Sequence, residues 1–336
     1  FAPAAPGTGK LVTDFGSGAS DVGHSVTVQA DGKIVVAGAS DSGSSYNFGV
    51  VRYNTDGSLD TGFNGTGKLV TDFGSGTTDV GYSVTAQADG KIVVAGISHS
   101  GSSYNFAVVR YNTDGSLDTG FNGTGKLVTD FGSATYDVGF SVTVQTDGKI
   151  VVAGISHSGS SYNFAVVRYN TDGSLDTGFN GTGKLVTDFG SATYDEGRSV
   201  TVQADGKIVV TGYSHSGSSY NFAVARYNTD GSLDTGFNST GKLVTDFGSG
   251  ADDLGYSVTV QADGKIVVAG YSNSGGSNDF AVVRYNTDGS LDTGFGSSGK
   301  LVTDIGSGTN DVGHSVTVQA DGKIVVAGYS NSGGSN

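Results

Sequence analysis

The chain has 336 residues, of which 58 are glycine and 2 are proline, and its formal net charge is −14. The acidic balance and the lack of a basic stripe exclude a nucleic-acid-binding protein that neutralises phosphates. No apolar run reaches the roughly 20 residues of a membrane helix, so membrane insertion is not expected. The absence of cysteine excludes disulfides.

One segment recurs along the whole chain. KLVTDF begins at Lys10 and returns every 58 residues, and the last copy reads KLVTDI. Self-similarity at a fixed period is the sequence signature of a repeat architecture. Residues 1–9 lie outside the repeat and are interpreted as a leader or linker before a single repeat domain at 10–336. Because residue 1 is not methionine, the chain is expected to begin after processing or to be cut from a longer one.

The second repeat shows four segments with strand character. Ser83–Gln87 alternates polar and apolar residues, and an Asp-Gly pair separates it from Lys91–Gly96. Such a pair between two β-rich runs predicts a hairpin with a type I′ turn. Phe106–Tyr111 and Lys126–Phe131 are the third and fourth segments. We name the four strands a, b, c and d, and four short strands per repeat predict an all-β protein made of propeller blades.

The repeat unit also resembles a known family. SVTVQADGKIVVAGYS and FAVVRYNTDGSLDTGFNGTGKLVTDF are similar to the delta-60 repeat of large bacterial secreted and surface proteins, over residues 7–336. The resemblance implies a β-propeller and an extracellular or cell-surface location. It carries no assigned catalytic residues, so it implies none here.

Counting strands predicts a six-bladed propeller whose sixth blade lacks strand c. Strand d of that blade is expected at 10–15, so that the N-terminal strand completes it. Three explanations stay open: a fragment of a longer array, a three-stranded blade, or a strand supplied by another chain in a homo-oligomer or fibre. The blades are expected at 24–73, 82–131, 140–189, 198–247, 256–305, and 314–336 plus 10–15.

Differences among the copies gather in the d–a and b–c loops, which antiparallel pairing places on one face. The residue before the serine of strand a varies most, and we expect these six side chains to line the mouth of the central channel. They are His24, Tyr82, Phe140, Arg198, Tyr256 and His314. Aromatic and arginine side chains suit a glycan, a peptide or a cation, or else they plug the channel. The sequence does not name the protein or glycan ligand.

Metal binding is expected to be weak or absent. His99, His157 and His215 recur at one loop position, and blades about 10 Å apart cannot share a zinc ion. They are therefore interpreted as solvated loop residues. No other cofactor is expected.

The c–d loop is the one candidate for calcium. Asn54, Asp56 and Asp60 follow the pattern of oxygen-rich calcium loops, but Arg52 stands where such loops carry an acid. A plain turn is therefore favoured, and these residues are only weak calcium candidates.

No catalytic residue is predicted. Glu196 and Arg198 form the only charged pair outside the repeat pattern, and a local ion pair explains them. We therefore predict a non-enzymatic extracellular or cell-surface scaffold that binds through the d–a/b–c face. The alternative is a self-assembling structural protein joined by strand addition at the sixth blade, and a propeller lyase or hydrolase is the third hypothesis.

Overall fold

A computed structural model describes most of the chain. The described residues are 9–16, 20–41, 43, 45–74, 78–100, 103–132, 136–158, 161–190, 194–248, 250–306 and 309–331. Every regular element among them is a β-strand. Within these ranges there is no helix with the length and apolar character needed to cross a bilayer. Residues 1–8 of the predicted leader lie outside the described residues.

The strands recur in the order that the repeat predicts. The a strands are β1 (Asp21–Val28), β5 (Asp79–Ala86), β9 (Asp137–Val144), β13 (Asp195–Val202), β17 (Asp253–Val260) and β21 (Asp311–Val318). The b strands are β2 (Ile34–Asp41), β6 (Ile92–Ser100), β10 (Ile150–Ser158), β14 (Ile208–Ser216), β18 (Ile266–Ser272) and β22 (Ile324–Ser330). The c strands are β3 (Tyr46–Tyr53), β7 (Ser103–Tyr111), β11 (Ser161–Tyr169), β15 (Ser219–Tyr227) and β19 (Asp279–Tyr285). The d strands are β4 (Lys68–Thr71), β8 (Lys126–Thr129), β12 (Lys184–Thr187), β16 (Lys242–Thr245) and β20 (Lys300–Thr303).

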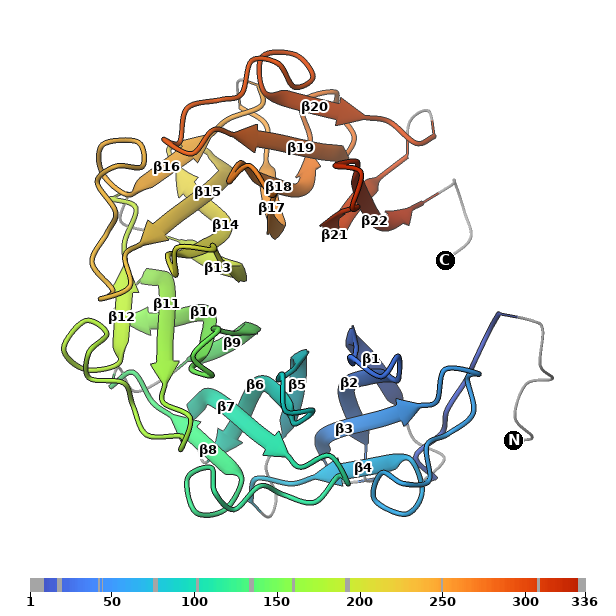
Figure 1. The fold of residues 1–336 in the computed structure, drawn as a ribbon. Coiled ribbons are helices and arrows are strands. Elements are labelled where there is room, and N and C mark those ends of the chain that lie inside the picture. Colours follow the sequence, from blue (N-terminus) through green and yellow to red (C-terminus); the bar gives the residue numbers. More distant parts are fainter. Residues whose placement is uncertain are drawn as a thin grey trace. The chain divides into compact units, whose positions relative to one another are not determined.

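The strands form six sheets, which confirms the prediction of six propeller blades. Five sheets have four strands in the order a-b-c-d, and the sixth contains β21 and β22 (Figure 1). Each a strand begins three residues before the position expected from the repeat, at an aspartate such as Asp21 rather than at His24.

The a–b hairpins are confirmed, but their predicted turn type is wrong. In the second blade only Gly90 of the Asp-Gly pair has a positive φ, of 82°. The amide of Gln87 donates to the carbonyl of Lys91 at 2.8 Å, and the amide of Gly90 donates back to the carbonyl of Gln87 at 2.9 Å. This pattern is a three-residue loop with a left-handed glycine, which also suits the strand twist.

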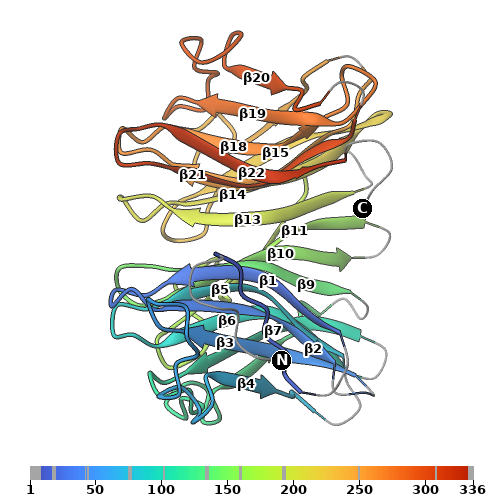
Figure 2. The ribbon, with the colours of Figure 1, turned by 90° about the vertical axis from the view of Figure 1, so that its right-hand side faces the viewer.

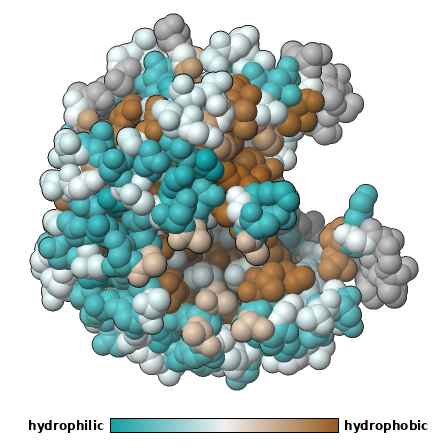
Figure 3. Space-filling view, turned by 45° about the horizontal axis from the view of Figure 1, so that its top comes forward, coloured by the Kyte–Doolittle hydropathy of each residue, from teal (hydrophilic) through white to brown (hydrophobic). Residues whose placement is uncertain are grey.

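The chain divides into two compact units. One comprises residues 1–152 and 169–175, and the other comprises 153–168 and 176–336. In the first unit Val35, Phe48, Phe63 and Tyr111 belong to one buried cluster. In the second unit equivalent positions, including Phe222, form a cluster of the same kind. Neighbouring sheets within a unit pack against each other (Figure 2). The space-filling view in Figure 3 shows a largely polar surface with scattered apolar patches. The single domain at 10–336 stays a prediction.

A repeated polar joint links neighbouring blades within each unit. Arg110 donates from Nε to Asp118 at 2.7 Å and from Nη1 to the carbonyl of Thr171 in the next blade at 2.6 Å. Its guanidinium carbon lies 4.7 Å from the ring centroid of Phe121. A buried guanidinium needs this many partners, because an unpaired buried charge is costly.

Residues 10–15 belong to no strand, unlike the prediction. They nevertheless make the contacts of a d strand with the first blade. Thr13 Oγ1 lies 2.5 Å from the hydroxyl of Tyr53, as Thr71 Oγ1 lies 2.7 Å from that of Tyr111. In each four-stranded sheet, strand d pairs only with strand c of the same blade. Among the described residues, no strand pairs with residues 10–15 in this way. Completion of the sixth blade by this segment stays a prediction.

Candidate functional site

A β-bulge positions the residue before the serine of each a strand whose pairing is described. In β5 the pairing register skips Tyr82, which becomes an extra residue between Gly81 and Ser83. A bulge of this kind re-aims its side chain. The facing glycine permits it, since a Cβ on Gly96 would lie 1.8 Å from the carbonyl oxygen of Val80. The same skip occurs in β1, β13, β17 and β21.

In the first unit three of the predicted ligand-binding residues lie next to one another. The ring centroids of His24 and Tyr82 are 5.3 Å apart, and those of Tyr82 and Phe140 are 5.5 Å apart. Burial lowers the pKa of His24. These three side chains form a continuous aromatic row across successive a strands.

In the second unit the other three residues are also neighbours. The guanidinium carbon of Arg198 lies 5.9 Å from the ring centroid of Tyr256, which stacks on His314 at 5.3 Å. Burial, followed by the positive charge of Arg198, lowers the pKa of His314. The structure therefore groups the six residues in two sets of three. Their joint role at a channel mouth stays a prediction.

The d–a and b–c loops that were predicted to form the binding face are described only in part. Segments 17–19, 75–77, 133–135, 191–193, 249 and 307–308 of the d–a loops lie outside the described residues. Residues 42, 44, 101–102 and 159–160 of the b–c loops do so as well.

One blade places a carboxylate at an apolar position. Glu196 is the second residue of β13 and is only 4% exposed. The equivalent residues Val138, Leu254 and Val312 are buried too. Glu196 forms an ion pair with Arg198, which the bulge holds on the same strand. The position therefore places a negative charge where the other buried copies carry hydrocarbon.

Tyrosines surround this ion pair. Tyr213 pairs with Glu196 across β13 and β14 and accepts a hydrogen bond from Arg198 Nη2 at 3.1 Å. The hydroxyls of Tyr213 and Tyr194 hydrogen-bond to Glu196. Tyr220 extends the cluster, with its ring centroid 5.4 Å from that of Tyr213. The pair thus lies inside a network of hydroxyl groups.

The charges and hydroxyls of this cluster perturb each other. Burial is the strongest single effect on Arg198 and acts to lower its pKa, but Glu196, Tyr213 and Tyr256 together outweigh burial and raise the pKa. Burial and the charge of Glu196 raise the pKa of Tyr213. Burial and the hydrogen bond to Glu196 raise the pKa of Tyr194. Perturbed titratable groups gathered in one place indicate a functional-site candidate.

Sequence reasoning found the Glu196–Arg198 pair but missed its tyrosines. Tyr213 lies in strand b, where the first two copies carry Ala39 and Ile97. Tyr271 and Tyr329 occupy the same position in the last two copies, so this tyrosine was only a weak signal. Its meaning depended on knowing that strand b pairs directly with the bulged segment of strand a.

The three repeated histidines are not loop residues, which corrects the prediction. His99, His157 and His215 belong to the b strands β6, β10 and β14. The ring of His99 lies 4.4 Å from that of Tyr104, its cross-strand partner. The b strands extend further than the repeat pattern indicated, because a tyrosine on strand c offers each histidine a packing surface.

The c–d loop directs its polar atoms inward. The Oδ1 atom of Asp56 accepts hydrogen bonds from the amide and hydroxyl of Ser58, at 2.9 and 2.6 Å. Asp60 pairs with Arg52 at 2.7 Å and with Lys33 at 3.1 Å. Asn54 Nδ2 donates to the Ser58 hydroxyl at 3.0 Å. These contacts are those of a closed turn, and calcium binding there stays a prediction.

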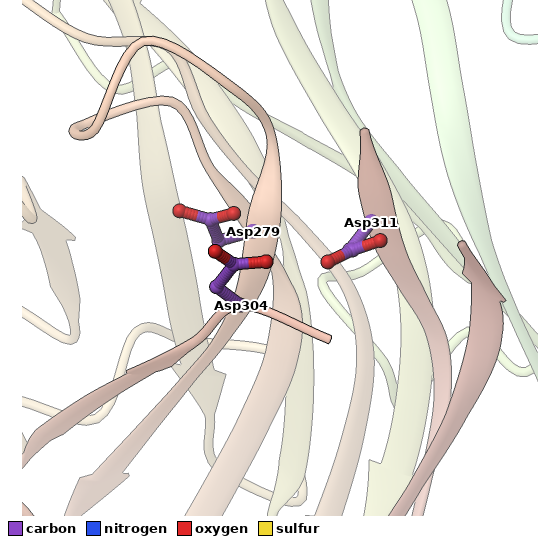
Figure 4. A group of neighbouring side chains, drawn as sticks. All are labelled: Asp279, Asp304 and Asp311. Carbon is purple, nitrogen blue, oxygen red and sulfur yellow. The ribbon is translucent and has the colours of Figure 1, made fainter. Parts of the chain in front are cut away.

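Three carboxylates converge between the fifth and sixth sheets, within the second unit. Oxygen atoms of Asp279, Asp304 and Asp311 all lie within 4.8 Å of one another (Figure 4). Asp279 and Asp311 are buried, and Asp304 is exposed. Burial, followed by the charge of Asp304, raises the pKa of Asp279. A group of this kind could hold a metal ion, and sequence reasoning did not single it out.

Solved structures with a similar fold include several enzymes. A protein of unknown function from Dyadobacter fermentans has a TM-score of 0.51 and 15% identity, over 91% of this chain and 89% of that one. A periplasmic gluconolactonase from Pseudomonas aeruginosa has a TM-score of 0.46 and 15% identity, over 88% and 76%. An endo-arabinase from Bacteroides thetaiotaomicron has a TM-score of 0.39 and 10% identity, over 76% and 91%. No curated protein matches the chain.

These structures correct the functional prediction. The chain was expected to be a non-enzymatic scaffold or a self-assembling structural protein, yet most of the similar structures carry the names of enzymes. That prediction is therefore wrong and is withdrawn. Identities of 10–15% show a shared fold alone, so they establish no activity for this chain.

A family model matches each repeat. The matched segments are 29–63, 87–121, 145–179, 203–237, 261–295 and 319–336. Each begins at the end of strand a and, in the first five copies, reaches the c–d loop. The delta-60 name stays a prediction. The chain belongs to the family described as a domain of unknown function (DUF5122) beta-propeller.

Proposed function

We propose that the chain is a hydrolase acting on an uncharged sugar ester or sugar lactone at the cluster around Glu196. One observation carries the proposal. A carboxylate that is 4% exposed replaces a valine or leucine of the other copies and contacts both a guanidinium and tyrosine hydroxyls. Burying a charge is costly, so an apolar residue would serve stability better at this position. The cost indicates a chemical use.

The surroundings suit a sugar. Tyr256 is partly exposed, and His314 stacked on it is exposed, so the pair offers an accessible aromatic surface. Aromatic faces pack against apolar faces of ligands, while their polar ends and the nearby hydroxyls form hydrogen bonds. The net charge of −14 disfavours a polyanionic substrate. An uncharged carbohydrate fits both properties.

The ion pair between Glu196 and Arg198 favours a role for Glu196 as a general base rather than as a general acid. A guanidinium in contact with a carboxylate stabilises its ionised form. Glycoside cleavage needs a carboxylic acid that protonates the leaving oxygen. Ester or lactone hydrolysis instead needs a base for water and a cation near the developing oxyanion. Glu196 and Arg198 supply these two groups.

The reaction can be written through the tyrosine network. A water molecule hydrogen-bonded to the hydroxyl of Tyr194 transfers a proton to the oxygen of that hydroxyl. At the same time, the hydroxyl proton of Tyr194 passes to the carboxylate of Glu196. The resulting hydroxide attacks the carbonyl carbon, and Arg198 stabilises the oxyanion. When the intermediate collapses, the carbon–oxygen ester bond breaks and the leaving alkoxide takes the proton back from Glu196. Tyr194 is partly exposed, so it links the buried Glu196 to solvent.

The test is a hydrolysis assay with an isosteric variant. We expect wild type to open an aldonolactone or to hydrolyse an acetylated monosaccharide, and Glu196→Gln to lower kcat by a factor of about 100 or more. Asp89→Asn also replaces a carboxylate by its amide, but in an exposed a–b turn, so it is the matched control and keeps the rate. Far-UV circular dichroism shows that each variant is folded. The proposal fails if wild type turns over neither substrate, or if Glu196→Gln hydrolyses as fast as wild type.

An extracellular or cell-surface location belongs to the same proposal. It is supported by the resemblance of the repeat to those of secreted and surface proteins. Fractionation of the native host with an antibody to the chain tests it, and recovery in the cytosol alone would reject it.

A further inference from the structure

One face of the first blade lacks the cover that the same face has in the other blades. Val26 on β1 is 62% exposed, whereas its five copies are only 6–7% exposed. These copies are Val84, Val142, Val200, Val258 and Val316. Val84 belongs to one buried cluster with Phe48 and Val50, which lie on strand c of the preceding blade. In the second blade, a strand c therefore covers this face, and Val258 of the fifth blade is covered in the same way.

A cavity of about 160 Å³ lies on this face of the first blade. Four of the residues that line it have copies in the second blade that share a buried cluster with Phe48. The four are Val36, Gly49, Val51 and Tyr53, and their copies are Val94, Ala107, Val109 and Tyr111. An apolar cavity of about 150 Å³ is large enough for benzene. The cavity thus has the place and the size for one phenylalanine ring.

The surroundings of one glycine in strand a point to the same missing side chain. A Cβ added to Gly81 would lie 3.5 Å from Cδ2 of Phe48, which is on strand c of the preceding blade. A Cβ added to the equivalent Gly23 would meet only Val36 within 4 Å among the described residues. A phenylalanine ring from a strand c is therefore the part that the first blade lacks.

Residues 10–15 supply one wall of the cavity. Phe15 lines it, and the amide of Phe15 donates to Asp21 Oδ2 at 3.0 Å. In the first blade the copy of Phe15 is Phe73, whose ring centroid lies 5.0 Å from that of Phe48 on strand c. Phe15 is therefore held where it can pack against an incoming phenylalanine.

The outer edge of the cavity also lacks a neighbour. Residues 10–15 belong to no strand, and no strand among the described residues pairs with them. Val12 is 84% exposed, whereas its copy Val70, in a strand that pairs with strand c, is 44% exposed. The missing neighbour of this segment is again a strand c. We call the cavity and residues 10–15 together the first-blade groove.

From these contacts we infer that the first-blade groove binds one extended polypeptide strand of a partner protein, with the pattern Phe-x-Val-x-Arg. Strand c of the first blade has this pattern in Phe48, Val50 and Arg52. The phenylalanine of the ligand fills the cavity, and its valine covers Val26 as Val50 covers Val84. An added strand gains affinity from main-chain hydrogen bonds and specificity from pockets for alternate side chains.

The repeat also sets the register of the ligand and the role of its arginine. The phenylalanine of strand c faces the threonine of strand d in the four-stranded sheets, so the phenylalanine of the ligand is expected opposite Thr13. Arg52 Nη1 donates to the carbonyl of Thr113 in the next blade at 2.7 Å. The arginine of the ligand is expected to donate to the equivalent carbonyl, that of Thr55. The net charge of −14 favours a ligand that carries a cation.

A second folded copy of this chain does not suit the groove. In the five four-stranded sheets every strand c lies between strands b and d, so a folded copy has no strand c to donate. The ligand is therefore a segment of another protein that is unfolded or extended before it binds. Because ordering such a segment costs free energy, we expect a dissociation constant that is roughly micromolar.

The inference is tested with synthetic peptides and the full chain. A fluorescein-labelled peptide with the sequence of residues 104–111 should bind wild type in fluorescence anisotropy, with one peptide per chain. Val108→Asp in the peptide places a charge toward the groove and should weaken binding at least tenfold. Val109→Asp in the peptide is the matched control and should bind as the unchanged peptide does, because successive residues of a strand point to opposite faces.

The same contact is tested from the side of the protein. Val26→Asp should weaken binding of the unchanged peptide at least tenfold, and it should keep the melting temperature of wild type because Val26 is exposed. Val70→Asp is the matched control. Val70 and its copy Val128 are 44% and 45% exposed, so a preceding blade does not cover this position and the affinity should be unchanged.

Three results would each overturn the inference. They are absence of binding to wild type at millimolar peptide, equal affinity for the two aspartate peptides, and undiminished binding by Val26→Asp. Light scattering should show one copy of the chain in the complex, and a complex with two copies would overturn it as well. None of these measurements depends on hydrolysis at Glu196, so this inference and the proposed function fail separately.

Discussion

The ion pair of the fourth blade can be replaced by the residues that the second blade carries at the same positions. Val80, Gly81 and Tyr82 stand where the fourth blade has Glu196, Gly197 and Arg198. The single variants Glu196→Val and Arg198→Tyr and the double variant form a thermodynamic cycle. The cycle separates the free energy of the charged contact from that of the packing.

The structure sets the order of stabilities. Arg198→Tyr leaves a carboxylate that is 4% exposed without its cation, which costs about 3–5 kcal/mol. Glu196→Val leaves the guanidinium unpaired, but its side chain is 29% exposed and retains some water, so the cost falls to about 2–3 kcal/mol. In the double variant the desolvation penalty disappears with both charges, and about 1 kcal/mol is lost for each tyrosine hydrogen bond. We expect it to lie within about 1 kcal/mol of wild type.

Urea unfolding followed by far-UV circular dichroism measures the cycle, with the urea midpoint and slope compared among the four proteins. The expected coupling free energy is about 4 kcal/mol or more, since each single variant is less stable than the double. If the two single costs simply add in the double variant, the pair is not electrostatically coupled. The reasoning about Glu196 would then be refuted, whatever the hydrolysis assay shows.

Two further predictions concern the repeat itself. Gly96→Ala should destabilise the fold by about 3 kcal/mol or more, because its Cβ would lie 1.8 Å from the Val80 carbonyl oxygen and open the bulge. Gly65→Ala is the control, because Gly65 has a φ of +72° but no atom within 4 Å of its Cβ position. We expect the control to cost only about 1–2 kcal/mol in the same urea experiment. Burial acts to raise the pKa of Asp118, but the lysine and arginine beside it outweigh burial and hold the pKa below 3.8. The stabilisation from this ion pair is therefore complete above about pH 4 and is lost as the pH falls through the lowered pKa of Asp118. We expect acidification to reduce the melting temperature of Asp118→Asn less than that of wild type.

Equal costs for the two glycine variants would show that the bulge tolerates a side chain. An acid-induced loss of melting temperature that is the same in Asp118→Asn and wild type would show that this carboxylate does not contribute to the acid transition.

Much of the fold could be predicted because its determinants are local. The 58-residue period, the alternation in Ser83–Gln87 and the glycine at position 90 each act within a few residues of the chain. The turn type failed because the pattern does not say how many residues the loop holds, and the hydrogen bond from Gln87 to Lys91 decides that number.

The candidate sites were less accessible to sequence reasoning. Glu196 looked like a local ion pair because Arg198 is two residues away, and its contact with Tyr213 depends on strand pairing. Asp279 looked like one more aspartate in an acidic chain. Its neighbours Asp304 and Asp311 come from separate segments, so only packing shows that the three carboxylates converge.

The amino-acid sequence alone determined the repeat, the number of sheets, the order of strands and the position that varies most between copies. These follow from periodicity and from turn residues, which act over short stretches of backbone. Only the tertiary structure decided that this variable residue sits on a bulge, that Glu196 is buried among tyrosines, and that residues 10–15 contact the first blade as a d strand does, although no strand among the described residues pairs with them. The reason is that burial and strand register arise between segments that are distant in the chain, where no local pattern records them.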